Sequence, residues 1–279
     1  MLRKAFNFFL FTSLFIAICA VVMVLQTNQL LHLQYDHYVY LGYVFSSTIC
    51  SYNFHWYLTP FAEGENDRAE WTRRHKNLHI ALFVAGALAS AWFFFQLLHV
   101  WLWMLVPVVL TFLYSAPKIP GWPFSLLKKV AIGKTIFLSF VWMYVTTLLP
   151  VLLHEGAVGG SAVLFCCSRF FLIYAICIIF DYRDRINDKR EGIRSMITYL
   201  DERGINILFY GSLVVFFLST LGLFYYHFTT LSILFLLLPG LIVLLLFSKA
   251  KRDFSDYLYY FVLDGMMMFS ALLTFFLRF

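Results

Sequence analysis

Nine runs of mostly apolar residues divide this chain, and each is close to the length that crosses a lipid bilayer as one helix. The hydrocarbon core of a bilayer is roughly 30 Å thick, so a crossing helix needs about 20 such residues. The runs cover 6–25, 38–59, 78–97, 99–115, 131–153, 161–181, 204–226, 229–247 and 257–277. We therefore expect an all-α integral membrane protein, with one bundle of nine transmembrane helices forming a single domain over residues 1–279.

The composition agrees with a protein that sits in lipid. Of the 279 residues, 62% are hydrophobic and only 13% are charged, whereas soluble domains carry roughly 25% charged residues. The five cysteines all lie within apolar runs and show no metal-site or disulfide spacing. The apolar part of a signal peptide is usually about 7–15 residues long. The run 6–25 is longer, so we expect it to be a retained first helix.

The basic residues predict an orientation, because cytoplasmic loops of membrane proteins are enriched in Lys and Arg. If the N-terminus is cytoplasmic, 18 of the 21 basic residues lie in cytoplasmic segments, and only Lys134, Arg169 and Arg278 lie elsewhere. We expect the N-terminus inside, the C-terminus outside, and the plasma (inner) membrane of a bacterium as the location. The net charge of +6 follows from this asymmetry, so it does not indicate a nucleic-acid partner.

Three aspartates close the sixth apolar run. Asp181, Asp184 and Asp188 stand at i, i+3 and i+7, so on a helix they share one face. Carboxylates on one face repel one another unless a cation joins them, and Mg²⁺ takes oxygen ligands and bridges to substrate phosphates. Arg183 and Arg185 lie between the aspartates and could receive phosphate oxygens. The pattern indicates a metal–diphosphate site; a solvated helix end of mixed charge is the alternative.

This aspartate pattern, followed by Gly192-Ile193-Arg194, resembles the second aspartate-rich motif of the UbiA superfamily of intramembrane prenyltransferases. The segment Tyr114-Ser115-Ala116-Pro117-Lys118 is similar to that family's Tyr-Ser-x-Pro loop, and the basic run 128–134 follows it. The resemblance implies a nine-helix fold, Mg²⁺, a polyprenyl diphosphate donor and a lipophilic acceptor. It makes Asp181, Asp184 and Asp188 the catalytic metal ligands, and it makes Lys118, Lys134, Arg183 and Arg185 candidates for diphosphate binding.

The family's first aspartate motif is altered at the end of the second run. Asn53 is kept, but Phe54, Tyr57 and Phe61 stand at the three aspartate positions. Asn53, His55 and Tyr114 are candidate pocket residues, and we expect Asn53 to share one cytoplasm-facing cavity with Asp181, on adjacent helices.

Three accounts of the missing aspartates stay open. Asn53 and His55 could form a polar site that holds phosphate without metal. The acidic segment 63–70 could fold back and supply carboxylates. The protein could instead have lost prenyl transfer and bind a lipid or quinone on the same fold.

Two charged residues lie inside predicted spans, where charge is costly and functional roles are common. Arg169 lies in the sixth run and Asp264 in the ninth, each about half-way along. We expect an Arg169–Asp264 ion pair, either as a structural contact or as a polar wall of a substrate chamber. The same pair is the best sign of a secondary transporter, which is a less favoured hypothesis.

Overall fold

The computed structural model describes residues 2–59, 67–116, 133–154, 158–190 and 195–277, and all regular structure in these ranges is helical. The first half contains α1 (Leu2–Phe11), α2 (Leu14–Leu30), α3 (His37–Leu58), α4 (Asp67–Arg74), α5 (Lys76–Gln96) and α6 (Trp101–Ser115). The second half contains α8 (Lys134–Met143), the π-helical turn η5 (Tyr144–Leu148), α9 (Leu149–Leu153), α10 (Gly160–Arg190), α11 (Met196–Tyr199), α12 (Glu202–Gly222), α13 (Thr230–Ala250), the π-helical turn η7 (Leu258–Leu263) and α14 (Asp264–Thr274). Short 3₁₀ turns at Leu98–Val100 and Leu223–Tyr226 complete the helical structure of these ranges.

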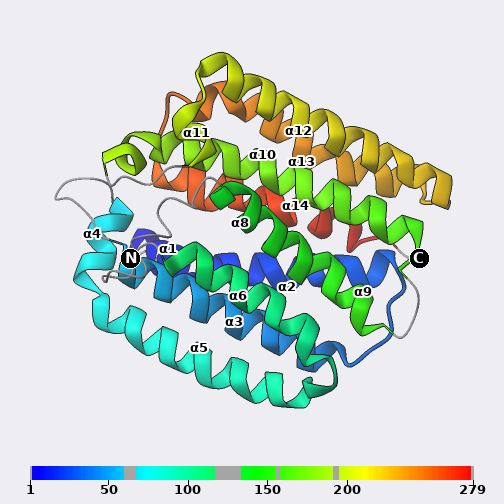
Figure 1. Cartoon of the computed structure of the whole chain (residues 1–279), viewed down its shortest axis with the longest axis horizontal. Helices are drawn as coiled ribbons and strands as arrows, with labels where there is room; N and C mark the ends of the chain where they lie inside the picture. The colour runs from blue at the N-terminus through cyan, green and yellow to red at the C-terminus, as the bar shows by residue number, and fades with distance from the viewer. Residues whose placement is uncertain (1, 60–66, 117–132, 155–157, 191–194, 278–279) are drawn as a thin grey trace.

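The apolar helices support a multi-pass membrane protein. By length and composition, six helices of the described ranges could cross a membrane, and a seventh could if the bent α1–α2 pair is one span. Two predicted spans fall short: α3 is long but rich in Ser, Thr and Tyr, and η7 with α14 is short. The start of α1 and the end of α14 lie at opposite ends of the molecule (Figure 1).

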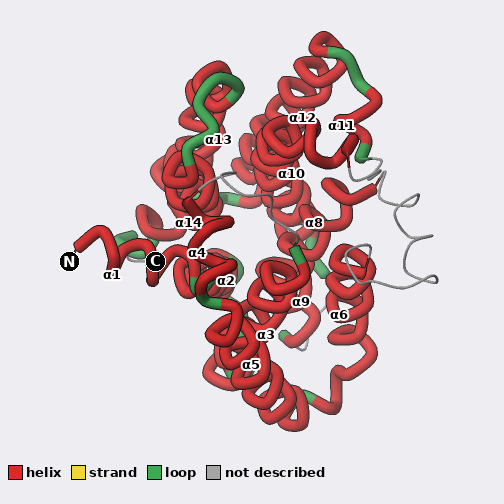
Figure 2. Tube along the Cα trace, turned by 90° about the vertical axis from the view of Figure 1, so that its left-hand side faces the viewer, coloured by secondary structure: helices red, strands yellow, loops and turns green. Residues whose placement is uncertain are grey.

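A ring of helices organises the bundle. In order around the ring, α2, α3, α6, α8, α10 and α14 each pack on the next, and α14 closes on α2 (Figure 2). Outside the ring, α5 packs on α3, α12 packs on α10, and α13 packs on α14. The prediction that α3 and α10 are adjacent is therefore wrong: the two helices face each other across the ring.

Two helix boundaries differ from the sequence prediction. The run 6–25 forms two helices that meet at 61°, with Ser13 in the left-handed region at φ 67°. Helix α10 continues nine residues beyond the apolar run and ends at Arg190. Its 31 residues extend about 46 Å at 1.5 Å per residue, which exceeds a hydrocarbon core of roughly 30 Å. The charged last turns of α10 therefore have room to lie beyond the lipid core.

The turn η5 shows how irregular backbone is accommodated inside the bundle. A π-turn displaces carbonyls from the regular α-helical hydrogen bonds, and unsatisfied carbonyls are costly away from water. Here the Tyr40 hydroxyl donates to the Val145 carbonyl at 2.6 Å, and the Thr27 hydroxyl donates to the Thr146 carbonyl at 2.7 Å. These bonds join α2 and α3 to the middle of the ring.

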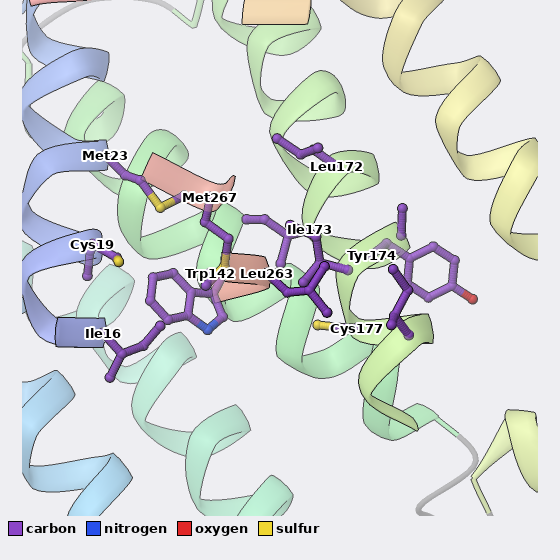
Figure 3. Close-up of a cluster of buried hydrophobic side chains, with 14 of the residues drawn as sticks. Ile16, Cys19, Met23, Trp142, Leu172, Ile173, Tyr174, Cys177, Leu263 and Met267 are labelled. Carbon is purple, nitrogen blue, oxygen red and sulfur yellow. The ribbon is translucent and has the colours of Figure 1, made fainter. Parts of the chain in front are cut away.

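The apolar core fills the space between α2, α8, α10 and α14. Figure 3 shows Ile16, Cys19 and Met23 of α2 facing Met267 and Leu263, with Trp142 of α8 and Cys177 of α10 beside them. In the described ranges Cys19 and Cys177 are buried and unpaired, as expected for small apolar side chains.

Arg169 does not pair with Asp264, so that prediction is wrong. Its Nη2 donates to Oε1 of Gln26 at 2.8 Å, and its guanidinium lies 4.9 Å from the centre of the Phe165 ring. The Gln26 amide in turn donates to the Thr274 hydroxyl at 2.9 Å. This buried chain of hydrogen bonds joins α10, α2 and α14. A guanidinium buried in an apolar bundle is costly without hydrogen-bond acceptors, and Gln26 supplies one to Arg169.

We expect Gln26→Leu to lower stability by about 1–3 kcal/mol, because it leaves the buried Arg169 without its acceptor. The same substitution at the exposed Gln34 is the control and should have little effect. Thermal unfolding of both variants in detergent micelles measures the difference. Equal melting temperatures for Gln26→Leu and wild type would show that Arg169 finds other acceptors.

Candidate functional site

The helix ring encloses a cavity of about 710 Å³, a volume typical of small-molecule sites. Most of its lining is apolar, and aromatic rings from six of the helices and from η7 border it. These rings are Phe15, Tyr43, Tyr52, Phe54, Trp56, Phe83, Phe94, Phe112, Tyr114, Trp142, Phe180 and Tyr260. Such a lining suits a hydrocarbon chain.

Charged side chains border the same cavity. They are Arg68 of α4, Lys134 of α8, Asp181, Arg183 and Asp184 of α10, and Asp264 of α14. The first five come from α4, the start of α8 and the last turns of α10, which lie towards the end of the molecule where α1 begins (Figure 1). The cavity therefore combines an apolar body with a strongly polar end, as an amphipathic ligand requires.

One ammonium group serves two of the predicted aspartates. Lys134 Nζ lies 3.5 Å from Oδ1 of Asp181 and 3.3 Å from Oδ2 of Asp188. The Thr135 hydroxyl also donates to Asp181. Both carboxylates are nearly buried, so the positive charge between them offsets a repulsion that water does not screen. The common helical face of these residues is confirmed, and a lysine lies between two of them.

The third aspartate has a different partner. Arg183 Nε donates to Oδ1 of Asp184 at 2.8 Å, and its Nη2 donates to the Tyr260 hydroxyl at 2.9 Å. The Arg183 guanidinium also lies over the rings of Tyr259 and Tyr260, at 4.3 and 4.9 Å from their centres. Asp184 and Arg183 thus form one half of the polar end, and the Lys134 group forms the other.

Arg68 is a cavity residue that the sequence did not single out. Its guanidinium lies 3.9 Å from the centre of the Trp56 ring and 4.2 Å from that of Tyr260, and the residue is only 3% exposed. Burial lowers the pKa of Arg68 to about 10, and the charge of Arg183 acts in the same direction, while Asp264 and Asp256 act against it. The side chain therefore carries its charge at neutral pH.

The predicted pocket residues separate into two groups. His55 and Tyr114 line the cavity, and their rings stack at 5.1 Å. Asn53 does not line it: the side chain is fully buried, donates to the carbonyls of Thr12 and Ile49, and contacts His79 Nδ1 at 2.7 Å. The expectation that Asn53 faces Asp181 in a shared cavity is therefore wrong, because the amide packs between α3, α5 and the α1–α2 break.

The acidic segment does not supply carboxylates to the cavity within the described residues. Asp67 pairs with Arg3 at 2.9 Å, and Glu70 pairs with Arg74 on the surface. The hypothesis of a segment that folds back required carboxylates at the cavity. Helix α4 does reach the cavity, but the residue that lines it is Arg68 rather than an acid.

Two of the four predicted diphosphate residues are not seen at the cavity. Arg185 pairs with Glu202 at 2.7 Å and lies over the Tyr182 ring, away from the cavity lining. Lys118 lies outside the described residues. Lys134 and Arg183 line the cavity, and no sequence signal pointed to Tyr260 as a partner of Arg183 or to Thr135 as a second donor to Asp181.

A magnesium site made of the three aspartates alone does not fit this geometry. Lys134 lies between Asp181 and Asp188, and Asp184 is engaged by Arg183. Within the described ranges, no three His, Cys, Asp or Glu side chains are grouped as metal ligands. The magnesium prediction therefore stays a prediction from the resemblance, and no chemical step below depends on it.

Comparison with family models, curated proteins and solved structures finds no match to this chain. The function proposed below therefore depends on the cavity and on the sequence motifs.

Lys134 and Asp188 are expected to be energetically coupled. Lys134→Gln should destabilise the protein, because it leaves two buried carboxylates facing each other. Adding Asp188→Asn should recover part of the loss, with a coupling energy of about 1–3 kcal/mol in a double-mutant cycle of unfolding free energies. Lys249→Gln at an exposed position is the control. Additive effects of the two changes would show that the contact contributes nothing.

Proposed function

We propose that this protein is a divergent membrane prenyltransferase, which moves a prenyl group from a polyprenyl diphosphate to a lipophilic acceptor such as a quinone precursor or a lipid. The main support is the cavity, whose aromatic body ends in Arg68, Lys134 and Arg183. A polyprenyl diphosphate has the same division, with a long hydrocarbon chain and a compact anionic head. The motif resemblance around Asp181 and Tyr114 points to the same class of ligand.

The proposed reaction breaks the allylic C–O bond of the donor, and the electron pair leaves with the diphosphate. The allylic carbon then bonds to the acceptor, which releases a proton. Cationic side chains at the polar end would stabilise the leaving diphosphate, as preorganised charges do for developing anions. Rings such as Tyr52, Trp142 and Phe180 would face the allylic cation and keep water away from it.

A non-catalytic protein that binds a lipid or quinone in the same cavity is the second candidate. Its support is that Asp181 and Asp188 share Lys134 and that the first motif has no aspartates. Secondary transport has lost its best support, because Arg169 binds Gln26 instead of Asp264.

We further propose nine spans, with the N-terminus in the cytoplasm of a bacterium and the polar end of the cavity facing it. Single cysteines at Arg190 and Gly159, near the two ends of α10, test this in a variant without the five native cysteines. A membrane-impermeant thiol reagent added to intact cells should label position 159 and not position 190. Labelling of position 190 from outside would reverse the orientation.

Binding of the donor is expected to require the apolar body of the cavity. Geranylgeranyl diphosphate with Mg²⁺ should raise the melting temperature of the wild type, since a ligand that binds only the folded state stabilises it. Ser51→Trp would fill part of the cavity that Ser51 lines and should abolish this shift. Ser51→Ala adds no volume and should keep it.

Transfer is tested separately from binding, by incubating membranes with labelled geranylgeranyl diphosphate and extracting prenylated lipid. A thermal shift without any product from several acceptor classes would favour the non-catalytic candidate. Absence of a shift with donors of several chain lengths would remove the prenyltransferase proposal and leave the non-catalytic lipid- or quinone-binding candidate in the lead.

A further inference from the structure

We infer that Arg68 and Arg183 bind the phosphate oxygens of the ligand directly, so that this protein holds a diphosphate head group without a divalent metal. The inference rests on the proposed function in so far as the ligand is a polyprenyl diphosphate. It departs from the Mg²⁺ site that the resemblance implies, and it assigns to Arg68 a role that the sequence did not suggest.

The two guanidinium groups converge on one ring at the cavity. Arg68 lies 4.2 Å and Arg183 lies 4.9 Å from the centre of Tyr260, and Arg183 also donates to the Tyr260 hydroxyl. All three residues line the cavity. Tyr260 and Trp56 hold the planar group of Arg68 in place, which leaves it little rotational freedom to lose when an anion binds.

Each guanidinium has a donor that is not used. Arg68 Nε and Arg183 Nη1 are buried and make no hydrogen bond to any described residue. A buried donor without an acceptor costs about 1–3 kcal/mol, more when it is charged. A bound water or ion is one explanation of such a group in a folded protein, and here both donors belong to residues that border one cavity.

The neighbouring carboxylates do not satisfy these donors. Asp256 accepts from the backbone N–H of Arg68 at 2.8 Å, and Asp184 accepts from Arg183 Nε. Asp264 also lines the cavity and accepts from neither of these donors. These acids reduce the cost of burying two like charges near each other, but they leave Arg68 Nε and Arg183 Nη1 without an acceptor.

Arg68 lies beside the segment that corresponds to the altered first aspartate motif. It stacks on Trp56, which lies between the positions of Phe54 and Tyr57, where the family pattern has aspartates. An aspartate with a metal and a guanidinium both present positive charge to an anion, and the guanidinium adds a planar pair of donors that matches phosphate oxygens. The chain therefore has a cation on this side of the cavity that needs no metal.

The test is binding of geranylgeranyl diphosphate and of inorganic pyrophosphate to the full-length protein in detergent, with EDTA and separately with Mg²⁺. Wild type should bind geranylgeranyl diphosphate in EDTA. Arg68→Gln and Arg183→Gln should each weaken that binding roughly 10- to 100-fold, the effect of losing a charge-assisted hydrogen bond. Pyrophosphate should bind more weakly but show the same dependence on both arginines.

Controls separate folding from binding. Arg252→Gln, at an exposed position whose side chain bonds the Ser248 carbonyl, should bind as wild type does. Arg68→Lys keeps the charge without the planar fork and should give an intermediate affinity. The melting temperature of each variant without ligand shows whether it folds, and Arg68→Lys replaces Arg68→Gln if the latter does not.

The outcomes distinguish the two proposals. Binding of geranylgeranyl diphosphate only with Mg²⁺ would overturn this inference and leave the proposed function standing. Wild-type affinity in the arginine variants in EDTA would also overturn it. No binding with or without Mg²⁺ would remove the proposed function, and this inference with it.

Discussion

The contact of Lys134 with Asp181 and Asp188 holds the polar end of the molecule together. Charges at the edge of an apolar bundle are costly unless they are paired, and this lysine brings the start of α8 against the last turns of α10. Helix α8 also packs on α6 and on α10, its two neighbours in the ring, so its position helps to determine theirs. The cavity is thus enclosed by apolar packing along its length and by ion pairs at one end.

Hydropathy predicted most of the helices because lipid imposes one constraint on every span. A backbone without water must bond to itself, so each long apolar run becomes a helix. The same signal did not reveal the bend at Ser13, since neither Gly nor Pro marks it, and it ended α10 too early. Most of residues 182–190 are charged, yet they continue the helix because Lys134, Tyr260 and Glu202 supply partners for their side chains.

The candidate site was harder to predict than the fold because its contacts join segments far apart in the chain. The spacing of Asp181, Asp184 and Asp188 gave their common face correctly, but nothing local in the sequence shows that Lys134 lies between two of them. Asn53 looked like the remnant of a motif, and its amide instead closes hydrogen bonds to Thr12 and Ile49. Arg68 is one of many arginines in surface segments, and only its place between two rings distinguishes it.

The two arginines and the acids around them explain how the cavity tolerates charge before a ligand arrives. Burial raises the pKa of Asp256, while Arg68 and Arg183 act against that shift, so the acid and the two bases stabilise one another's charged forms. The acids balance the charge of the arginines and leave Arg68 Nε and Arg183 Nη1 without an acceptor. An anion that enters must compete with Asp256 and Asp264 for the positive potential, and it gains the hydrogen bonds that these acids do not make. Under the proposed function, the unused donors would favour a phosphate over a neutral head group, and the aromatic body of the cavity would accommodate the hydrocarbon chain.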